Sequence, residues 1–117
     1  MKRNAGNFGP LAPAALHILL ALAGDDLHGY GIMQEIVRQS EGKYRIGPGT
    51  LYDNLKKLMA QGLVEETAIR FSKDGPRRRY YRLNAAGRGV LLAEIERLQG
   101  VVREARTHLR GLKPRRA

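Results

Sequence analysis

The sequence predicts a mainly α-helical chain with one small β-hairpin: three short helices come first, then the hairpin, then a long C-terminal helix. Three observations support this order. Apolar residues recur at helical spacing in residues 28–40 and again from residue 48. Two strand-like runs flank the turn sequence "SKDGP". A seven-residue apolar repeat then runs through the last segment.

The first two helices are expected to form most of the core. The run "LAPAALHILLALAG", residues 11–24, is almost wholly apolar, which indicates a helix buried on most sides. Pro13 suits its first turn, and Gly24 suits its end. Residues 28–40 place Ile32, Met33, Ile36 and Val37 on one face.

The third helix is predicted to begin at Pro48, with Gly47 at the cap, and to stop before Gly62. Its apolar side carries Leu51, Leu55, Leu58 and Met59, whereas Thr50, Asp53, Asn54, Lys56 and Lys57 lie on the other side or its flanks. An amphipathic helix of this kind packs on the core and leaves its polar face to solvent.

The hairpin is expected to consist of strands in residues 63–71 and 77–83. Asp74-Gly75 is a turn signal, and Pro76 delays the start of the second strand. Tyr80 and Tyr81 favour a strand, and alternation predicts that one of them packs inward.

The last helix should start after Asn84, which is a suitable cap. Its heptad pattern has branched residues at most a positions and leucine at most d positions, which favours pairing with a second helix. The seam residues are Leu91, Ile95, Leu98, Val102, Ala105, Leu109 and Leu112. We therefore divide the chain into an N-terminal unit of three helices and a hairpin, residues 1–84, and a dimerisation helix with a basic tail, residues 85–117; the charge and the order of elements discussed below make the first unit the candidate DNA-binding domain.

Composition narrows the function classes. The net charge is +10, of which residues 63–117 carry +8, and such a basic half favours a nucleic-acid partner over solubility alone. There are no cysteines, so disulfides and thiolate zinc sites are excluded. No apolar run is long enough for a bilayer span and no signal peptide is evident, so we expect a cytoplasmic protein without membrane contact.

Catalysis and metal binding find little support in the sequence. Ser40 and Ser72 have no nearby base pattern, and Glu65 and Glu66 alternate to opposite faces of a strand. The three histidines, His17, His28 and His108, do not have metal-ligand spacing. We expect neither an enzyme nor a cofactor.

The order of elements is that of a winged helix-turn-helix with a C-terminal helical extension. In that architecture the third helix enters the major groove, so Thr50, Asn54, Lys56 and Lys57 are candidate DNA contacts. The "GPGT" sequence lacks the ending of a P-loop, and its helix start at Pro48 and Gly49 serves either as plain capping or as a site for a DNA phosphate. In the wing, Lys73, Arg77, Arg78 and Arg79 are candidate phosphate contacts.

Three motifs carry a resemblance to a known family: "LHGYGI" at 27–32, "GPGTLYDNLKKLMAQGLVE" at 47–65 and "GPRRRYYRLNAAGRGVL" at 75–91. In this order they resemble the short branch of the PadR family of bacterial transcriptional regulators. The resemblance implies a homodimer joined through the last helix, a repressor bound to operator DNA, and a small-molecule effector in many members.

The same resemblance places the recognition helix at residues 48–61, with Thr50, Tyr52, Asn54 and Lys56 or Lys57 at DNA, and the wing at residues 70–82. Tyr30 matches the tyrosine of a family motif. Asp53 and Gly31 depart from the residues common at their positions, and the tail has no tryptophan to stack a drug ligand.

The prediction is thus a sequence-specific repressor that binds a pseudo-palindromic operator as a homodimer, with an effector of unknown identity. Two alternatives stay open. A sequence-neutral architectural DNA binder would use the basic charge alone, and a winged-helix adaptor would bind a partner protein instead.

Overall fold

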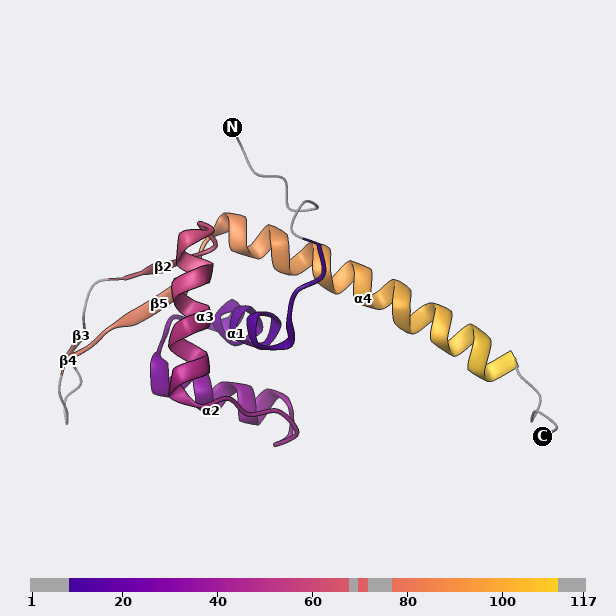
Figure 1. Ribbon diagram of the computed structural model, residues 1–117, viewed down its shortest axis with the longest axis horizontal. Helices are drawn as coiled ribbons and strands as arrows, with labels where there is room; N and C mark the ends of the chain where they lie inside the picture. The colour runs from indigo at the N-terminus through magenta and orange to yellow at the C-terminus, as the bar shows by residue number, and fades with distance from the viewer. Residues whose placement is uncertain (1–8, 68–69, 72–76, 112–117) are drawn as a thin grey trace.

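The computed structural model describes residues 9–67, 70–71 and 77–111 and has the predicted mainly helical fold (Figure 1). In chain order the elements are α1 (Pro13–Gly24), β1 (Leu27–His28), α2 (Gly29–Gln39), α3 (Pro48–Ala60), β2 (Val64–Glu66), β3 (Arg70–Phe71), β4 (Arg77–Arg78), β5 (Tyr80–Leu83) and α4 (Ala85–Gly111). The winged helix-turn-helix with a C-terminal helix is thereby confirmed.

The helix starts follow the local signals in the sequence. Pro13 and Pro48 occupy the first turns of α1 and α3, where a missing N–H costs nothing. His28 caps α2, because its Nδ1 accepts a hydrogen bond from the Gly31 backbone N–H at 3.0 Å. Gly62 adopts a φ of +78° just after α3, a conformation that glycine takes without a Cβ clash.

The core is built around α1, which packs against α2, α3, α4 and β5. Helices α1, α2, α3 and α4 and strands β2 and β5 each contribute buried apolar residues. The buried set is Ile18, Leu19, Ala21 and Leu22 from α1, Ile32 and Ile36 from α2, Leu51, Leu55 and Leu58 from α3, Leu63, Val64, Tyr81 and Leu83 from the sheet region, and Val90 and Leu91 from α4.

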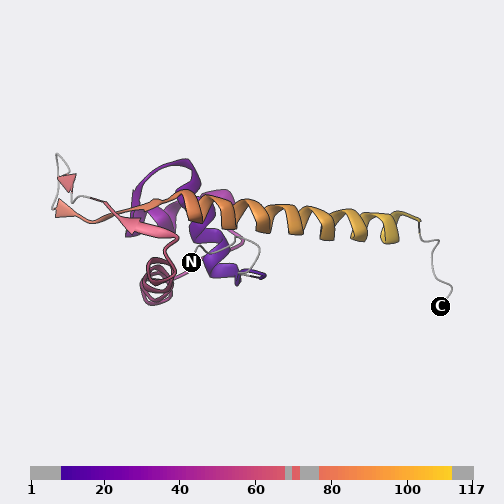
Figure 2. The same cartoon turned by 90° about the horizontal axis from the view of Figure 1, so that it is seen from above.

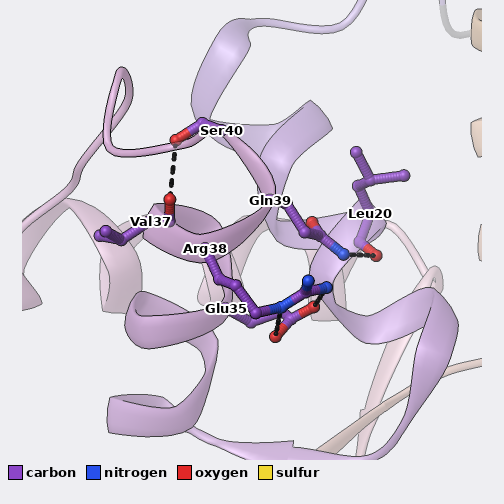
Figure 3. Close-up of polar contacts among 6 residues, drawn as sticks. All are labelled: Leu20, Glu35, Val37, Arg38, Gln39 and Ser40. Atoms are coloured by element: carbon purple, nitrogen blue, oxygen red, sulfur yellow. Dashed lines mark hydrogen bonds and ion pairs between the residues drawn. The ribbon is translucent and has the colours of Figure 1, made fainter.

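The C-terminal end of α2 is joined to α1 by a polar contact as well as by apolar packing. Gln39 Nε2 donates to the Leu20 carbonyl at 3.4 Å, while Arg38 pairs with Glu35 on the solvent side (Figure 3). Ser40, at the end of α2, accepts a hydrogen bond from the Tyr44 N–H at 3.0 Å and so closes the connection towards α3.

The sheet differs from the single hairpin that the sequence predicts. The long strands expected in residues 63–71 and 77–83 are each divided: β2 pairs with β5, and β3 pairs separately with β4. A third strand, β1, pairs with β5 in the register Leu27↔Tyr81, which gives the order β1-β5-β2. Two residues are too few for a period-two pattern, so β1 is not visible in the sequence. Tyr81 is the tyrosine that packs inward.

A tight joint connects the end of α3 to the start of α4. Asn84 Oδ1 accepts from the Gly87 N–H at 2.8 Å, as expected for a cap, and Asn84 Nδ2 donates to the Gly62 carbonyl at 2.8 Å. Gly87 lies so close to Leu63 that a Cβ on it would overlap the Leu63 carbonyl oxygen. We call these residues, Gly62, Leu63, Asn84 and Gly87, the α3–α4 joint.

Beyond its first turns, α4 projects away from the rest of the molecule (Figures 1 and 2). Val90 and Leu91 lie in the core, but every described side chain from Val101 onwards is exposed. The Cα radius of gyration is accordingly 17.3 Å, compared with about 13 Å for a compact chain of similar size. No helix in the described residues has the length and apolar character that crossing a membrane requires.

The joint generates a stability prediction. Gly87→Ala should destabilise the protein by roughly 1–3 kcal/mol, because the new methyl meets a backbone carbonyl that cannot rotate away. Gly100→Ala in the same helix meets open space, with its nearest neighbour the far end of the Arg103 side chain at 3.9 Å. It should be neutral or stabilising by about 0.5–1 kcal/mol. Urea denaturation followed by circular dichroism measures both, and equal effects would contradict the close packing at Gly87.

Candidate nucleic-acid interface

The polar face of α3 is open to solvent along its whole length. Leu51, Leu55 and Leu58 anchor the opposite face in the core. The exposed predicted DNA contacts on α3 are Pro48, Gly49, Thr50, Tyr52, Lys56 and Lys57, and Asn54 is partly exposed. The helix therefore brings the predicted contacts together on one accessible surface, which we call the α3 face.

Two hydrogen-bonded or charged pairs order this face. Asn54 Nδ2 donates to the Thr50 carbonyl at 2.9 Å, which leaves the second amide hydrogen and Oδ1 of Asn54 available for other partners. Lys57 Nζ lies 3.4 Å from an Asp53 carboxylate oxygen in an exposed i,i+4 pair. The acidic residue that the sequence places on this face is thus partly compensated by a neighbouring lysine.

Tyr52 connects the α3 face to the start of α2. Its side chain is 49% exposed, yet its hydroxyl lies over Gly29, where an added Cβ would overlap the Tyr52 oxygen. Gly29 therefore provides the space that this tyrosine occupies. Tyr52 is therefore both a packing residue and part of the solvent-exposed surface.

The wing arginines have partners within the chain. Arg79 Nε lies 2.7 Å from Glu66 Oε2 on the neighbouring strand β2. Arg78 Nη1 lies 3.0 Å from His28 Nε2. Strand pairing between β2 and β5 brings Glu66 beside Arg79, although the two residues are thirteen positions apart. The side chain of Arg77 and the whole of Lys73 lie outside the described residues.

His28 is the residue whose role here the sequence did not reveal. It caps α2 through Nδ1 and contacts Arg78, fifty positions later, through Nε2. Its ring also meets Tyr80 edge-on, with centroids 5.3 Å apart. Burial, and then the positive charge of Arg78, lower the pKa of His28, so the ring stays neutral. The His-Gly sequence at a helix start is the local signal for the cap; the arginine contact has none.

The exposed half of α4 forms a second candidate surface. A groove along it is lined by Ile95, Leu98 and Val102 on the apolar side and by Arg103, Arg106 and Arg110 on the other. Val102 is 46% and Leu109 is 71% exposed, which is unusual for apolar residues on a helix. We call this surface the α4 seam.

The predicted seam residues differ in how much of each side chain is exposed. Leu91 is only 7% exposed and packs in the core of its own chain, so its side chain has little area left for a partner. Ile95 is partly buried against the same core, and the seam proper begins there. Ala105 is exposed with its neighbours, and Leu112 lies outside the described residues.

Within the described residues, no three His, Asp or Glu side chains converge as a metal site requires. The candidate binding surfaces in the described residues are instead the α3 face, the paired wing arginines, and the α4 seam with its apolar and arginine side chains. These are suited to binding an extended anionic partner and a second helix.

Comparisons with known proteins bear on the same features. The model of the "Transcriptional regulator PadR-like family" matches residues 18–93. Transcriptional regulator Rv3488 of Mycobacterium tuberculosis is 39% identical over 95 residues, which cover 80% of this chain and 82% of that protein.

Solved structures show the same fold at lower identity. A PadR family transcription regulator from Clostridium difficile R20291 matches with a TM-score of 0.70 at 23% identity, over 86% of this chain and all of that one. Bacillus subtilis PadR in complex with operator DNA matches with a TM-score of 0.63 at 21% identity, over 74% of this chain and 48% of that one.

The cap at His28 leads to a pH prediction. Its pKa is lowered in the folded state from an ordinary 6.5. As pH falls below about 6.5, the unfolded chain takes up the proton first, so the free energy of unfolding should decrease down to the folded-state pKa. In His28→Asn, a capping side chain without a titrating ring, this decrease should be smaller. Thermal melts of both proteins between pH 7.5 and 5 test it; parallel curves would contradict a neutral capping histidine.

Proposed function

The chain belongs to the PadR-like family of transcriptional regulators, and from this premise we propose that it is a homodimeric repressor that binds a pseudo-palindromic operator. The observation that supports this most directly is the α3 face, which presents ordered polar and cationic side chains while its apolar side is held in the core. A face of this kind fits the major groove of B-DNA, which is about 12 Å wide.

Within this proposal the contacts divide by chemistry. Asn54 is suited to reading bases, because its free amide hydrogen and oxygen match the paired donor and acceptor of adenine, and its bond to Thr50 holds the amide in place. Lys56, Lys57 and the N-terminal turn of α3 at Pro48 and Gly49 are suited to phosphate. The wing arginines add a second group of phosphate contacts.

The dimer in this proposal forms through the α4 seam. In the single chain, Val102 and Leu109 on this half of α4 are exposed and Leu98 is partly exposed. Their heptad spacing suits a second copy of the same helix. Two-fold symmetry then places the two α3 faces for half-sites about one or two helical turns apart, in multiples of ~34 Å.

An effector, where one acts, would change the separation of the two α3 faces through the α4 helices. This part of the proposal rests on the resemblance to family members that respond to small molecules. Nothing in it requires a cofactor.

The experiment that tests the function is binding to a labelled duplex from the region upstream of the protein's own gene, against a scrambled duplex, over a salt series. Strong preference for one duplex with steep salt dependence supports a specific regulator. Equal binding to both duplexes, together with no preferred sequence in a genome-wide selection of DNA fragments, would support the architectural alternative. Absence of binding to any duplex would favour the protein adaptor.

Two substitutions on the α3 face should behave differently. Lys57→Ala removes a cation that faces phosphate, so it should weaken binding to all duplexes and reduce the slope of log K against log salt by about 1. Asn54→Ala should instead reduce the preference for the operator over the scrambled duplex, by roughly 1–3 kcal/mol. Fluorescence anisotropy measures both, and wild-type binding by both variants would contradict the placement of α3 at DNA.

The seam has its own test. Leu98→Glu places a charge in the apolar contact between two helices and should shift the protein from dimer to monomer in sedimentation experiments. Glu96→Lys, a charge change two positions earlier on another side of the helix, serves as the control and should leave the dimer intact. A dimer that survives Leu98→Glu would place the interface elsewhere.

A further inference from the structure

A small open pocket lies between the two elements that the proposed function brings to DNA. It has a volume of about 300 Å³ and lies where the start of α2, the first half of α3 and strands β4 and β5 meet. The lining residues are His28, Gly29, Tyr30, Tyr52, Arg78, Arg79 and Tyr81. No carboxylate is among them, and Glu66, an acid in contact with this set, is already paired with Arg79.

The protonation of His28 gives the pocket its chemistry. Because Nδ1 accepts a hydrogen bond from the Gly31 N–H, the proton of the neutral ring must be on Nε2. That Nε2–H lies 3.0 Å from Arg78 Nη1, which is also a donor. Two donors cannot satisfy each other, so the contact lacks an acceptor. One anionic oxygen placed beside both groups would accept from each of them.

Other groups around the pocket favour the same kind of ligand. Tyr30, which is 59% exposed, and Tyr52 also line the pocket, and the Tyr52 hydroxyl beside Gly29 is a neutral donor. The positive end of the α2 dipole opens towards it. The ion pair between Arg79 Nε and Glu66 on β2 holds the Arg79 guanidinium beside the pocket.

We propose that this pocket binds one phosphate of the DNA backbone, with His28 Nε2–H and Arg78 donating to the same phosphate oxygen. This inference rests on the proposed function, because a DNA phosphate is the anion that a duplex lying on the α3 face and the wing would bring to this position. The pocket then has a positioning role: one phosphate is held by the cap of α2 and by the wing, which fixes the register of α3 in the groove.

The role of His28 in this site is that of a neutral donor. Protonation would remove the acceptor that caps α2 and add a positive charge beside Arg78. The site therefore uses an imidazole that the fold keeps in one tautomer, and the lowered pKa of His28 supports that state.

The experiment uses the full-length protein and its preferred duplex, in which single phosphates are replaced one at a time by neutral methylphosphonates. At one position in each half-site, the replacement should weaken binding by the wild type roughly tenfold. At that position alone, the methylphosphonate should lower the affinity of Arg78→Ala by less than about twofold, because this variant no longer has the guanidinium that the phosphate would bind. His28→Asn, which keeps a cap for α2 but lacks the Nε2–H donor, should show a smaller loss at the same position.

Arg88→Ala is the matched control, since it removes the same charge from an exposed side chain at the start of α4, outside the α3 face, the wing and the α4 seam. It should retain the full methylphosphonate effect at every position. Circular dichroism melts confirm folding, and Arg78→Lys, which keeps the charge but not the guanidinium geometry, provides a second variant if Arg78→Ala is unstable.

The outcomes separate this site from the proposed function. Suppose that the wild type prefers its operator, but that every phosphate replacement weakens binding by Arg78→Ala as much as it weakens binding by the wild type. The phosphate site is then wrong, whereas the proposed regulator function is not contradicted. If Arg78→Ala and Arg88→Ala lose the same affinity with the same salt slope, the site is likewise wrong. If the wild type binds no duplex, both proposals fail together.

Discussion

The close approach of Gly87 to the Leu63 carbonyl is the constraint on which the arrangement of this protein depends. It brings the first turn of α4 against the backbone that follows α3, and Asn84 closes the contact by bonding to Gly62 and Gly87. A contact between backbone and a residue without a side chain has little freedom to slide or tilt. The direction in which the first turn of α4 leaves the end of α3 therefore depends on these few atoms.

The charged groups on the candidate DNA side are organised in a different way. Lys57, Arg78 and Arg79 each have a contact within the chain, to Asp53, His28 and Glu66. The exposed ion pairs Lys57–Asp53 and Arg79–Glu66 contribute little to stability, because solvent screens them. They do hold the cations in defined positions at small cost, and each paired acid also reduces attraction to an arbitrary polyanion. A protein that binds all DNA sequences equally through its positive charge has no use for such acids on its binding surface. Their presence therefore favours a contact in which the protein takes one defined position on the DNA.

Much of this arrangement could be predicted from the sequence, because it is encoded locally. The proline and glycine residues at helix ends, the apolar periodicity of α2 and α3 and the cap at Asn84 all act within a few residues. Other features depend on how distant segments pack and pair in register. These are the division of the wing, the strand β1, the burial of Leu91 and the pairing of Arg79 with Glu66. The contact between His28 and Arg78 spans fifty positions and becomes visible only when β1 and β5 lie side by side.

The rigidity of the α3–α4 joint also restricts how regulation can work in a dimer joined by α4. Because the joint fixes α4 to α3 within each subunit, the separation of the two α3 faces changes only when one subunit rotates against the other at the seam. The joint contains two glycines, Gly62 and Gly87, but the space beside Gly87 is filled by the Leu63 carbonyl, so this contact leaves little room for such a motion. A ligand that controls DNA binding must therefore bind the two arrangements of the seam with different affinities. The exposed apolar and arginine side chains between Ile95 and Arg110 are where that difference would arise.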